Sequence, residues 1–183
     1  MSGSVSADHF LASVRPVEAH ELPSPARELL DHRRTMTEVL AEFFGCEVDL
    51  RVLEQRTDLV SGIYDRRIVL VAREGRRVVE HGWLSVELAA LPSSVAEELV
   101  QGDTPFGRHL RILATPFRVE PDGWFRTEVE GEVASALGVR PGTSTVGRRS
   151  RICAEADGRV LARAVEVLAP LEPSPPAGER SAP

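Results

Sequence analysis

Glu166 is the residue whose setting in this sequence most clearly suggests chemistry. It belongs to an apolar run, residues 160–168, in which a β-strand would point successive side chains to opposite faces. The face that carries Glu166 is otherwise apolar, with Val160, Ala162, Ala164 and Leu168. Because burial of an unpaired carboxylate costs on the order of several kcal/mol, we expect Glu166 to be neutralised, paired with a cation or directed into a cavity.

A basic cluster precedes this run and could supply the cation. Residues 147–151 contain Arg148, Arg149 and Arg151. Arg149 and Arg151 are the expected partners of Glu166 if the glutamate is structural, and structural ion pairs of this kind also perturb pKa values. The three arginines could either contact a ligand or serve only to stabilise the hairpin and pair with neighbouring acidic residues.

The elements that position these residues follow from the apolar periodicity and the turn residues. Asp157-Gly158 separates the basic cluster from the apolar run and predicts a β-hairpin. Further strands are expected over residues 47–56, 66–72, 77–88, 112–120 and 124–129, helices over 35–44, 92–100 and 132–137, and a compact turn over 103–110. Glu74-Gly75 is too short a link for a parallel crossover, so the sheet is expected to be mostly antiparallel. The pattern predicts the α+β class, with helices on one face of the sheet and at its edges.

The length of 183 residues and the apolar content of 42% allow one substantial core, so a single domain is expected. Residues 1–22 show little periodicity and predict a flexible N-terminus. Residues 23–170 form the predicted domain. Residues 171–183 are rich in proline and predict a disordered tail.

The composition excludes several classes of function. The formal charge of −6 argues against a surface that binds nucleic acid. The two cysteines, Cys46 and Cys153, are too few for a disulfide framework or a cysteine zinc site, and no second His or Asp stands at metal-ligand spacing beside His81 or His109. No signal peptide or apolar run of about 18 residues is present, so a soluble cytoplasmic protein without a membrane partner is expected.

Four short motifs in order and approximate spacing resemble the chorismate pyruvate-lyase family. They are Arg67-Ile68-Val69-Leu70, Thr104-Pro105-Phe106-Gly107-Arg108-His109-Leu110, Gly147-Arg148-Arg149-Ser150-Arg151, and the glutamate of Val165-Glu166-Val167-Leu168-Ala169-Pro170. Thr35-Met36-Thr37 is similar to the opening of an early helix in that family. The segment from Glu132 through the Arg149 hairpin also resembles the effector-binding domain of GntR-type transcription regulators, which shares the lyase fold. The resemblance covers about residues 33–170.

The resemblance implies an enzyme that converts chorismate to 4-hydroxybenzoate and pyruvate without metal or organic cofactor. Arg67 matches the family arginine that binds a substrate carboxylate, and Glu166 matches the active-site glutamate that transfers a proton. Burial among apolar neighbours would raise the pKa of Glu166, as such a role requires. The same resemblance implies that Phe106, Gly107 and Arg149 line the substrate site, where Gly107 lets the backbone approach the ligand.

One departure from the family pattern concerns the second arginine that binds a carboxylate. Trp83 stands at the nearest matching position, and His81 or Arg77 could take its place as the second anchor. An aromatic side chain here would suit a less charged or larger ring-bearing ligand. Trp83 and His81 are therefore expected substrate-binding residues.

Three classes of function follow from these observations. The first is the lyase, or a diverged relative that acts on another small cyclic acid or an intermediate of secondary metabolism, with a small-molecule carboxylate as substrate and a monomer or homodimer as its assembly. The second is a non-catalytic small-molecule-binding module of the same fold. The 34 residues before Thr35 lack the room and pattern for a winged helix-turn-helix, which weighs against a complete regulator. The third is a catalytically inactive scaffold.

Overall fold

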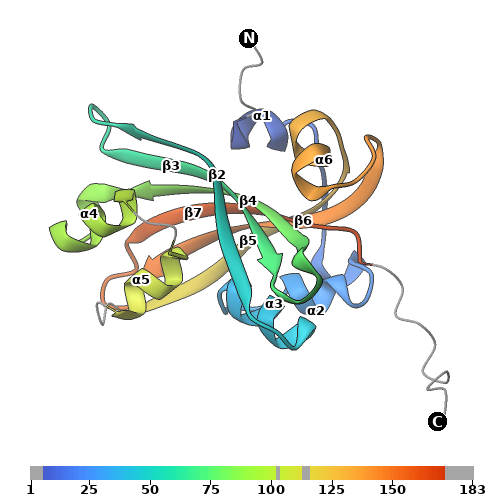
Figure 1. Ribbon diagram of the computed structural model, residues 1–183. Helices are drawn as coiled ribbons and strands as arrows, with labels where there is room; N and C mark the ends of the chain where they lie inside the picture. Colours follow the sequence, from blue (N-terminus) through green and yellow to red (C-terminus); the bar gives the residue numbers. More distant parts are fainter. Residues whose placement is uncertain (1–5, 102–103, 113–115, 172–183) are drawn as a thin grey trace.

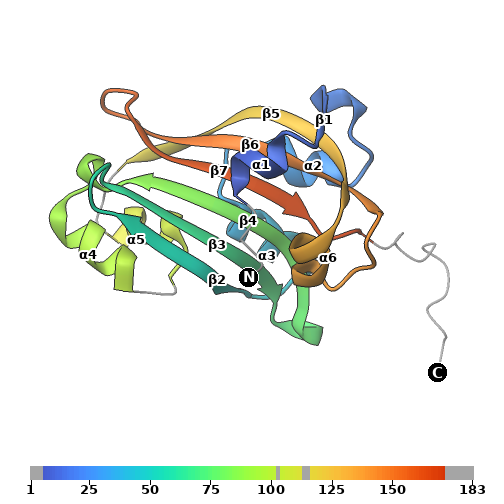
Figure 2. The same ribbon diagram turned by 90° about the horizontal axis from the view of Figure 1, so that it is seen from above.

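The computed structural model describes residues 6–101, 104–112 and 116–171. Its centre is one seven-stranded sheet with the strand order β1-β5-β6-β7-β4-β3-β2, in which every neighbouring pair is antiparallel (Figures 1 and 2). The strands are β1 (Arg15–Val17), β2 (Val48–Asp58), β3 (Ile63–Ala72), β4 (Arg77–Glu87), β5 (Phe117–Val129), β6 (Thr143–Ala154) and β7 (Val160–Leu168). The predicted α+β class, the single domain and the antiparallel sheet are confirmed.

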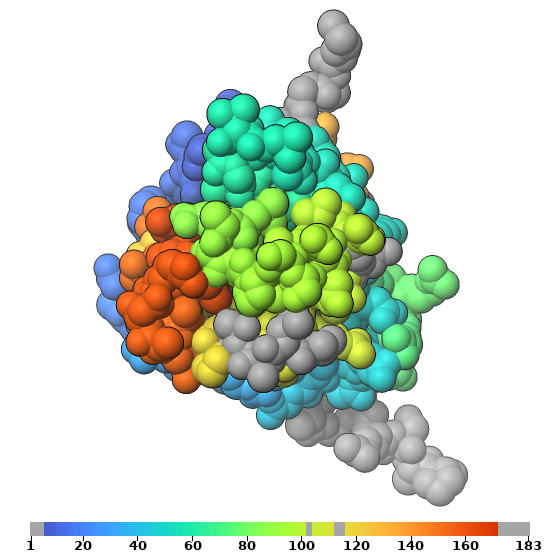
Figure 3. Space-filling view, turned by 90° about the vertical axis from the view of Figure 1, so that its left-hand side faces the viewer, coloured from blue at the N-terminus to red at the C-terminus, as the bar shows by residue number. Residues whose placement is uncertain are grey.

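Two groups of helices cover one face of the sheet, which we call the lower face. They are α2 (Ala26–Leu30) with α3 (Met36–Phe44), and α4 (Ser93–Gln101) with α5 (Phe106–Ile112) (Figure 1). Leu30 and Leu40 anchor the first group on Leu70 and Leu168, and each of these side chains is almost completely buried. The second group packs Leu99 and Leu110 on the opposite end of the same face. At this end α4 forms the outer surface between the β2–β3 and β6–β7 hairpins (Figure 3).

The upper face carries α1 (Ala7–Leu11) and α6 (Gly131–Leu137) (Figures 1 and 2). Phe10 of α1 is 5% exposed and lies in an apolar cluster with Trp83, Phe125 and Val165. Ser6 caps this helix by accepting the backbone N–H of His9. Three short 3-10 turns complete the fold, over Ala19–Glu21, Glu74–Arg76 and Leu88–Ala90.

The N-terminal segment departs from the sequence prediction. Residues 6–22 belong to the fold, because α1 packs on the sheet and β1 pairs with β5. The few apolar residues of this polar segment do not predict a helix or a strand by themselves. The segment is ordered because Phe10 packs on the sheet and β1 pairs with β5. The predicted tail at 171–183 lies almost wholly outside the described residues, apart from Leu171, which packs partly buried on the lower-face core.

Two further elements differ from the prediction. The compact turn expected over residues 103–110 contains helix α5, and residues 102–103 lie outside the described part of the chain. The strands expected over 112–120 and 124–129 are one strand, β5, with a register shift between Pro121 and Gly123. Proline cannot donate to a sheet ladder, so a bulge at Pro121 lets the strand continue past it. The remaining predicted helices and strands are present with small shifts at their ends.

Candidate functional site

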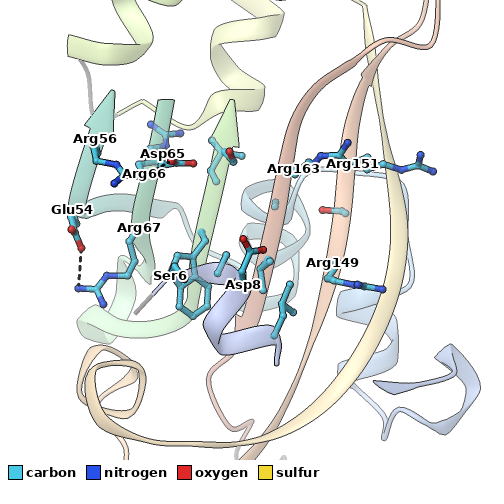
Figure 4. A pocket seen from close by; sticks show the side chains of 18 of the residues that line it. Ser6, Asp8, Glu54, Arg56, Asp65, Arg66, Arg67, Arg149, Arg151 and Arg163 are labelled. Carbon is cyan, nitrogen blue, oxygen red and sulfur yellow. Dashed lines mark ion pairs between the residues drawn. The ribbon is translucent and has the colours of Figure 1, made fainter. Parts of the chain in front are cut away.

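A cavity of about 600 Å³ lies on the upper face of the sheet, beneath α1. Strands β2 to β7 all contribute residues to its floor and walls, and the residues of α1 form its roof (Figure 4). Many of its lining residues are charged, namely Arg56, Arg66, Arg67, Arg149, Arg151 and Arg163 together with Asp8, Glu54, Asp65 and Asp122. The cavity is therefore both large enough for a small molecule and unusually rich in guanidinium groups.

The floor consists of two rows of side chains that run across the strands. The first row is Arg67, Trp83, Val165 and Arg149, each opposite the next in the sheet register. The second row is Asp65, Ser85, Arg163 and Arg151. Register partners point to the same face of a sheet, so the first row places two apolar side chains between two arginines. The second row places two arginines directly side by side.

Arg67, a predicted site residue, lies at one edge of this cavity. Its guanidinium pairs with Glu132 of α6 and lies 3.7 Å from Glu54 of β2. The side chain is only 14% exposed. Arg67 therefore joins α6 to the sheet, and its charge is compensated by protein carboxylates.

Trp83 and His81, the other predicted residues of β4, lie on the same face as Arg67. Trp83 lines the cavity and stacks on Phe10 of α1 with a ring-centroid distance of 4.8 Å. His81 is completely buried behind it, with its ring 4.3 Å from the Trp83 ring. Burial and the nearby Arg67 charge lower the pKa of His81 to about 3, so its ring is neutral at physiological pH. His81 thus supports the Trp83 wall and offers no positive charge to an anion.

Glu166 lies on the lower face of the sheet, where it is opposite Gly82 on one side and Arg148 on the other. Arg148 Nε is 2.5 Å from Glu166 Oε2, and Ser150 Oγ donates to the same oxygen at 3.2 Å. Glu166 is therefore paired with a cation, one of the three outcomes expected from its apolar face. The partner is Arg148 and not Arg149 or Arg151, because those two residues alternate to the upper face with the cavity.

The Arg148 guanidinium also holds the segment between α2 and α3. Its Nη1 donates to the carbonyl oxygens of Leu30 and His32, each at 3.0 Å, and its side chain is fully buried. A second carboxylate, Glu80, lies on the same face and is 2% exposed. Burial and the negative charge of Glu166 raise the pKa of Glu80 well above its ordinary value, against the lowering effect of Arg148.

The structure separates Arg67 from Glu166, although the family resemblance implies that both act on one substrate. Arg67 is in register with Trp83 and Val165, whereas Glu166 is in register with Gly82 one position along, so the two side chains point to opposite faces. The arginine of β3 on the face of Glu166 is Arg66, which is 3% exposed and donates to the carbonyl oxygen of Thr104 at 3.2 Å. A single ligand in the upper cavity cannot contact both predicted catalytic side chains.

Phe106 and Gly107 lie in α5, on the lower face. Phe106 is 4% exposed and belongs to the apolar core under α4 and α5. A Cβ on Gly107 would come within 2.6 Å of the Thr35 side chain, so this glycine allows α5 to pack against the start of α3. The upper cavity is lined by Arg67, Trp83 and Arg149 among the predicted residues, and not by Phe106, Gly107, His81 or Glu166.

Much of the site consists of residues that were not predicted from the sequence. Arg163, Arg151 and Ser85 of the second row face the cavity, and Asp8 reaches it from α1 (Figure 4). Strand alternation along residues 160–168 puts Arg163 and Val165 on the face opposite Glu166. The signal was therefore present, but an exposed arginine in a strand has no distinguishing pattern until its cross-strand neighbours are known.

Comparisons with known proteins identify solved structures that share this fold. No protein-family model matches the sequence, and no curated protein matches it either. The effector domain of PhnF from Mycobacterium smegmatis aligns with a TM-score of 0.60 and 12% identity, over 85% of this chain and 91% of that domain. A longer structure of PhnF also gives a TM-score of 0.60 at 12% identity, and there the alignment covers 74% of this chain and only 64% of PhnF.

A third structure is the ligand-binding domain of a protein assigned to the GntR family of transcriptional regulators from Bordetella bronchiseptica. It aligns with a TM-score of 0.50 and 15% identity, over 67% of this chain and 84% of that domain. At such low identities the similarity establishes a shared fold and no shared activity. The fold is thus that of GntR-type effector domains, as the sequence resemblance implied, and a chorismate lyase identity is not shown.

Two further properties bear on the kind of site. Across residues 6–101, 104–112 and 116–171, no three His, Cys, Asp or Glu side chains are grouped so that they could hold a metal ion. In the same ranges, none of the helices has the length and apolar character needed to cross a membrane.

Proposed function

We propose that this protein is a non-catalytic small-molecule-binding module that holds a small organic anion in the cavity under α1. The observation that carries the proposal is the cavity itself, about 600 Å³ in volume and lined by six arginines, all but Arg66 on the upper face of the sheet. Ligand pockets of small molecules commonly enclose about 300–1,000 Å³. Guanidinium groups recognise carboxylate and phosphate oxygens through paired hydrogen bonds.

The solved structures of this fold support the same class of function. One is described as an effector domain and another as a ligand-binding domain. The electrostatics of the cavity fit an anionic ligand. Arg56 is paired with Asp65 at 3.6 Å, but Arg149 donates only to the carbonyl oxygen of Asp122. Arg67 is paired with Glu54 and Glu132, and Arg151 with Glu120. The guanidinium groups of Arg149 and Arg163 make no ion pair with a carboxylate in the described part of the chain, so they remain available to an anion.

The lyase activity suggested by the sequence has weaker support. A carboxylate that transfers protons must reach the ligand, but Glu166 is held by Arg148 and Ser150 on the other face of the sheet. Arg67 is similarly engaged by Glu132 and Glu54. Neither side chain has the freedom or the common position that a joint catalytic role requires.

Thermal unfolding of the protein in the presence of a panel of aromatic and aliphatic carboxylates and phosphates tests the proposal. A ligand at 100 times its Kd should stabilise the folded state by about 2.7 kcal/mol, which raises Tm measurably. Amide resonances of β4 and β7 should shift when the ligand binds. If no member of the panel raises Tm or shifts these resonances, the proposed binding function is wrong.

Incubation with chorismate, with release of pyruvate as the readout, decides between binding and catalysis. We expect no pyruvate above the rate without protein. Pyruvate release by the native chain that is abolished by Glu166→Gln would instead establish the lyase activity and the role of that glutamate.

A further inference from the structure

The pair of arginines in the second row of the cavity floor has an unusual arrangement. Arg151 of β6 and Arg163 of β7 are directly opposite each other in the antiparallel register. Side chains in such pairs have Cβ atoms about 4.5–5.5 Å apart, and like charges in this position are destabilising. A sheet that keeps two guanidinium groups in this position gains stability when an anion lies between them.

The charges around this pair are only partly compensated. Arg151 Nη2 lies 3.4 Å from Glu120 of β5, the next residue in the row. Arg163 is exposed, and its guanidinium makes no hydrogen bond or ion pair with any residue in the described part of the chain. On its other side, Arg163 is opposite Ser85, whose hydroxyl is a further donor on the cavity wall. Strands β4, β7 and β6 thus each direct a hydrogen-bond donor toward the same part of the cavity.

The first row, next to the two arginines, provides an apolar surface. Trp83 and Val165 occupy the middle of the first row and are 8% and 7% exposed. Leu11 of α1 lines the cavity as well. An apolar group next to an oxyanion would therefore meet the Trp83 ring one row away from the two arginines.

We propose that Arg163 and Arg151, with Ser85, form the subsite for the oxyanion group of an amphipathic ligand, and that its apolar body lies along Trp83 and Val165 beneath α1. This inference rests on the proposed function, because it assumes that the cavity binds a small molecule, and it adds the orientation and the residues that determine specificity. The oxyanion is a phosphate or a carboxylate, the two groups that guanidinium pairs recognise.

Fluorescence titration of the Trp124→Phe protein tests this subsite. The chain has two tryptophans, and Trp124 lies away from the cavity, where its indole N–H donates to Leu30, so the variant leaves Trp83 as the reporter. Phenyl phosphate and phenylacetate are the two anionic probes, benzyl alcohol is the uncharged probe, and inorganic phosphate lacks the apolar body. We expect saturable binding of at least one aromatic anion, and weaker binding of benzyl alcohol and inorganic phosphate.

The decisive variant is Arg163→Gln in the same background. Loss of a charged hydrogen bond of about 1.5–3 kcal/mol corresponds to roughly a tenfold to hundredfold weaker affinity for the aromatic anion. Arg163→Lys should restore part of the loss, and Arg140→Gln, an exposed arginine of the α6–β6 connection, should leave affinity unchanged. Arg163 is exposed, so the substitution is not expected to unfold the protein, and a thermal melt verifies this.

The outcomes separate this inference from the proposed function. If an aromatic anion binds but Arg163→Gln binds it equally well, or if benzyl alcohol binds as tightly, the subsite is wrong although the cavity is a binding site. If neither aromatic anion binds but another organic anion shifts the amide resonances of β4 and β7, the cavity is a binding site and the proposal of an amphipathic ligand is wrong. If no organic anion binds, both are wrong.

Discussion

Arg148 and Arg149 are adjacent in the chain, but β6 directs them to opposite faces of the sheet. Arg148 is fully buried and compensates Glu166, and it also donates to the carbonyl groups of Leu30 at the end of α2 and of His32 between α2 and α3. Arg149 is exposed at the cavity and donates to one carbonyl group. The two residues therefore form a natural matched pair for a stability measurement.

Arg148→Ala should lower the free energy of unfolding by about 3–5 kcal/mol, because it leaves the buried carboxylate without its cation. Arg149→Ala should lower it by less than about 1 kcal/mol, since its side chain is solvated. Urea unfolding followed by circular dichroism measures both. Equal losses in the two variants would show that the Arg148 network does not stabilise the fold.

Glu80 predicts a particular dependence of stability on pH. Its pKa is raised above the ordinary value of 4.5 by burial and by Glu166, so the folded protein binds a proton that the unfolded chain releases. The stabilising contribution of protonated Glu80 is fully present below about pH 4.5 and is lost progressively as pH rises toward the raised pKa. Glutamine keeps the shape of the protonated side chain and does not titrate. The Tm of Glu80→Gln minus the Tm of the native protein should therefore increase as pH rises from about 4.5 to 8.

Thermal melts of both proteins across this pH range give the comparison. Glu97→Gln, an exposed position of α4, is the control and should follow the native protein. Parallel curves for Glu80→Gln and the native protein would contradict a raised pKa for Glu80.

At the scale of elements, α1 matters because it is both part of the core and the roof of the cavity. Phe10 contacts Trp83 at 4.8 Å and Phe125 at 5.9 Å between ring centroids. The helix has only five residues, and so short a helix is not stable by itself in water. Its position therefore depends on the Phe10 side chain.

Phe10→Ala should lower the free energy of unfolding by about 3 kcal/mol, at the lower end of the usual range for buried phenylalanine. It should also expose Trp83 to water and shift the fluorescence of the Trp124→Phe background to longer wavelength. An unchanged emission spectrum would mean that α1 stays in place without this anchor. The neighbouring exposed residue His9 provides the control, as His9→Ala should alter neither property.

The helical elements were predictable to different degrees. The helix expected over 35–44 is present as α3 because its signals are local, including the capping box of Thr35 with Glu38 and a left-handed Gly45 at the end. Helix α5 lacked such signals. Its burial depends on Phe106 and Leu110, which meet Leu99 of α4 and the lower sheet face only in the folded chain.

At the scale of the whole molecule, one continuous sheet separates two apolar layers. The lower layer is shared by four helices, and the upper layer by α1 and α6. Trp83 belongs to the upper layer and Trp124 packs on the lower one. Each tryptophan therefore reports on one side of the sheet.

We expect both layers to unfold together, as is usual for single domains of this size. In urea, the Trp83→Phe and Trp124→Phe proteins should each show the same midpoint by fluorescence and by far-ultraviolet circular dichroism. A fluorescence midpoint that precedes the circular dichroism midpoint in one variant only would show that the layer of its remaining tryptophan opens independently.

The sequence by itself determined the local features of this protein. Alternation and turn residues predicted the terminal hairpin, the two faces of β7 and the need to compensate Glu166, because each depends only on neighbours along one strand. The tertiary structure decided which arginine compensates it and that Arg67 lies on the other face. A shift of one residue in register exchanges the two faces of a strand. The relation between β3 and β7 passes through β4, so no pattern within either strand can fix it. The cavity likewise exists only where six strands and α1 come together.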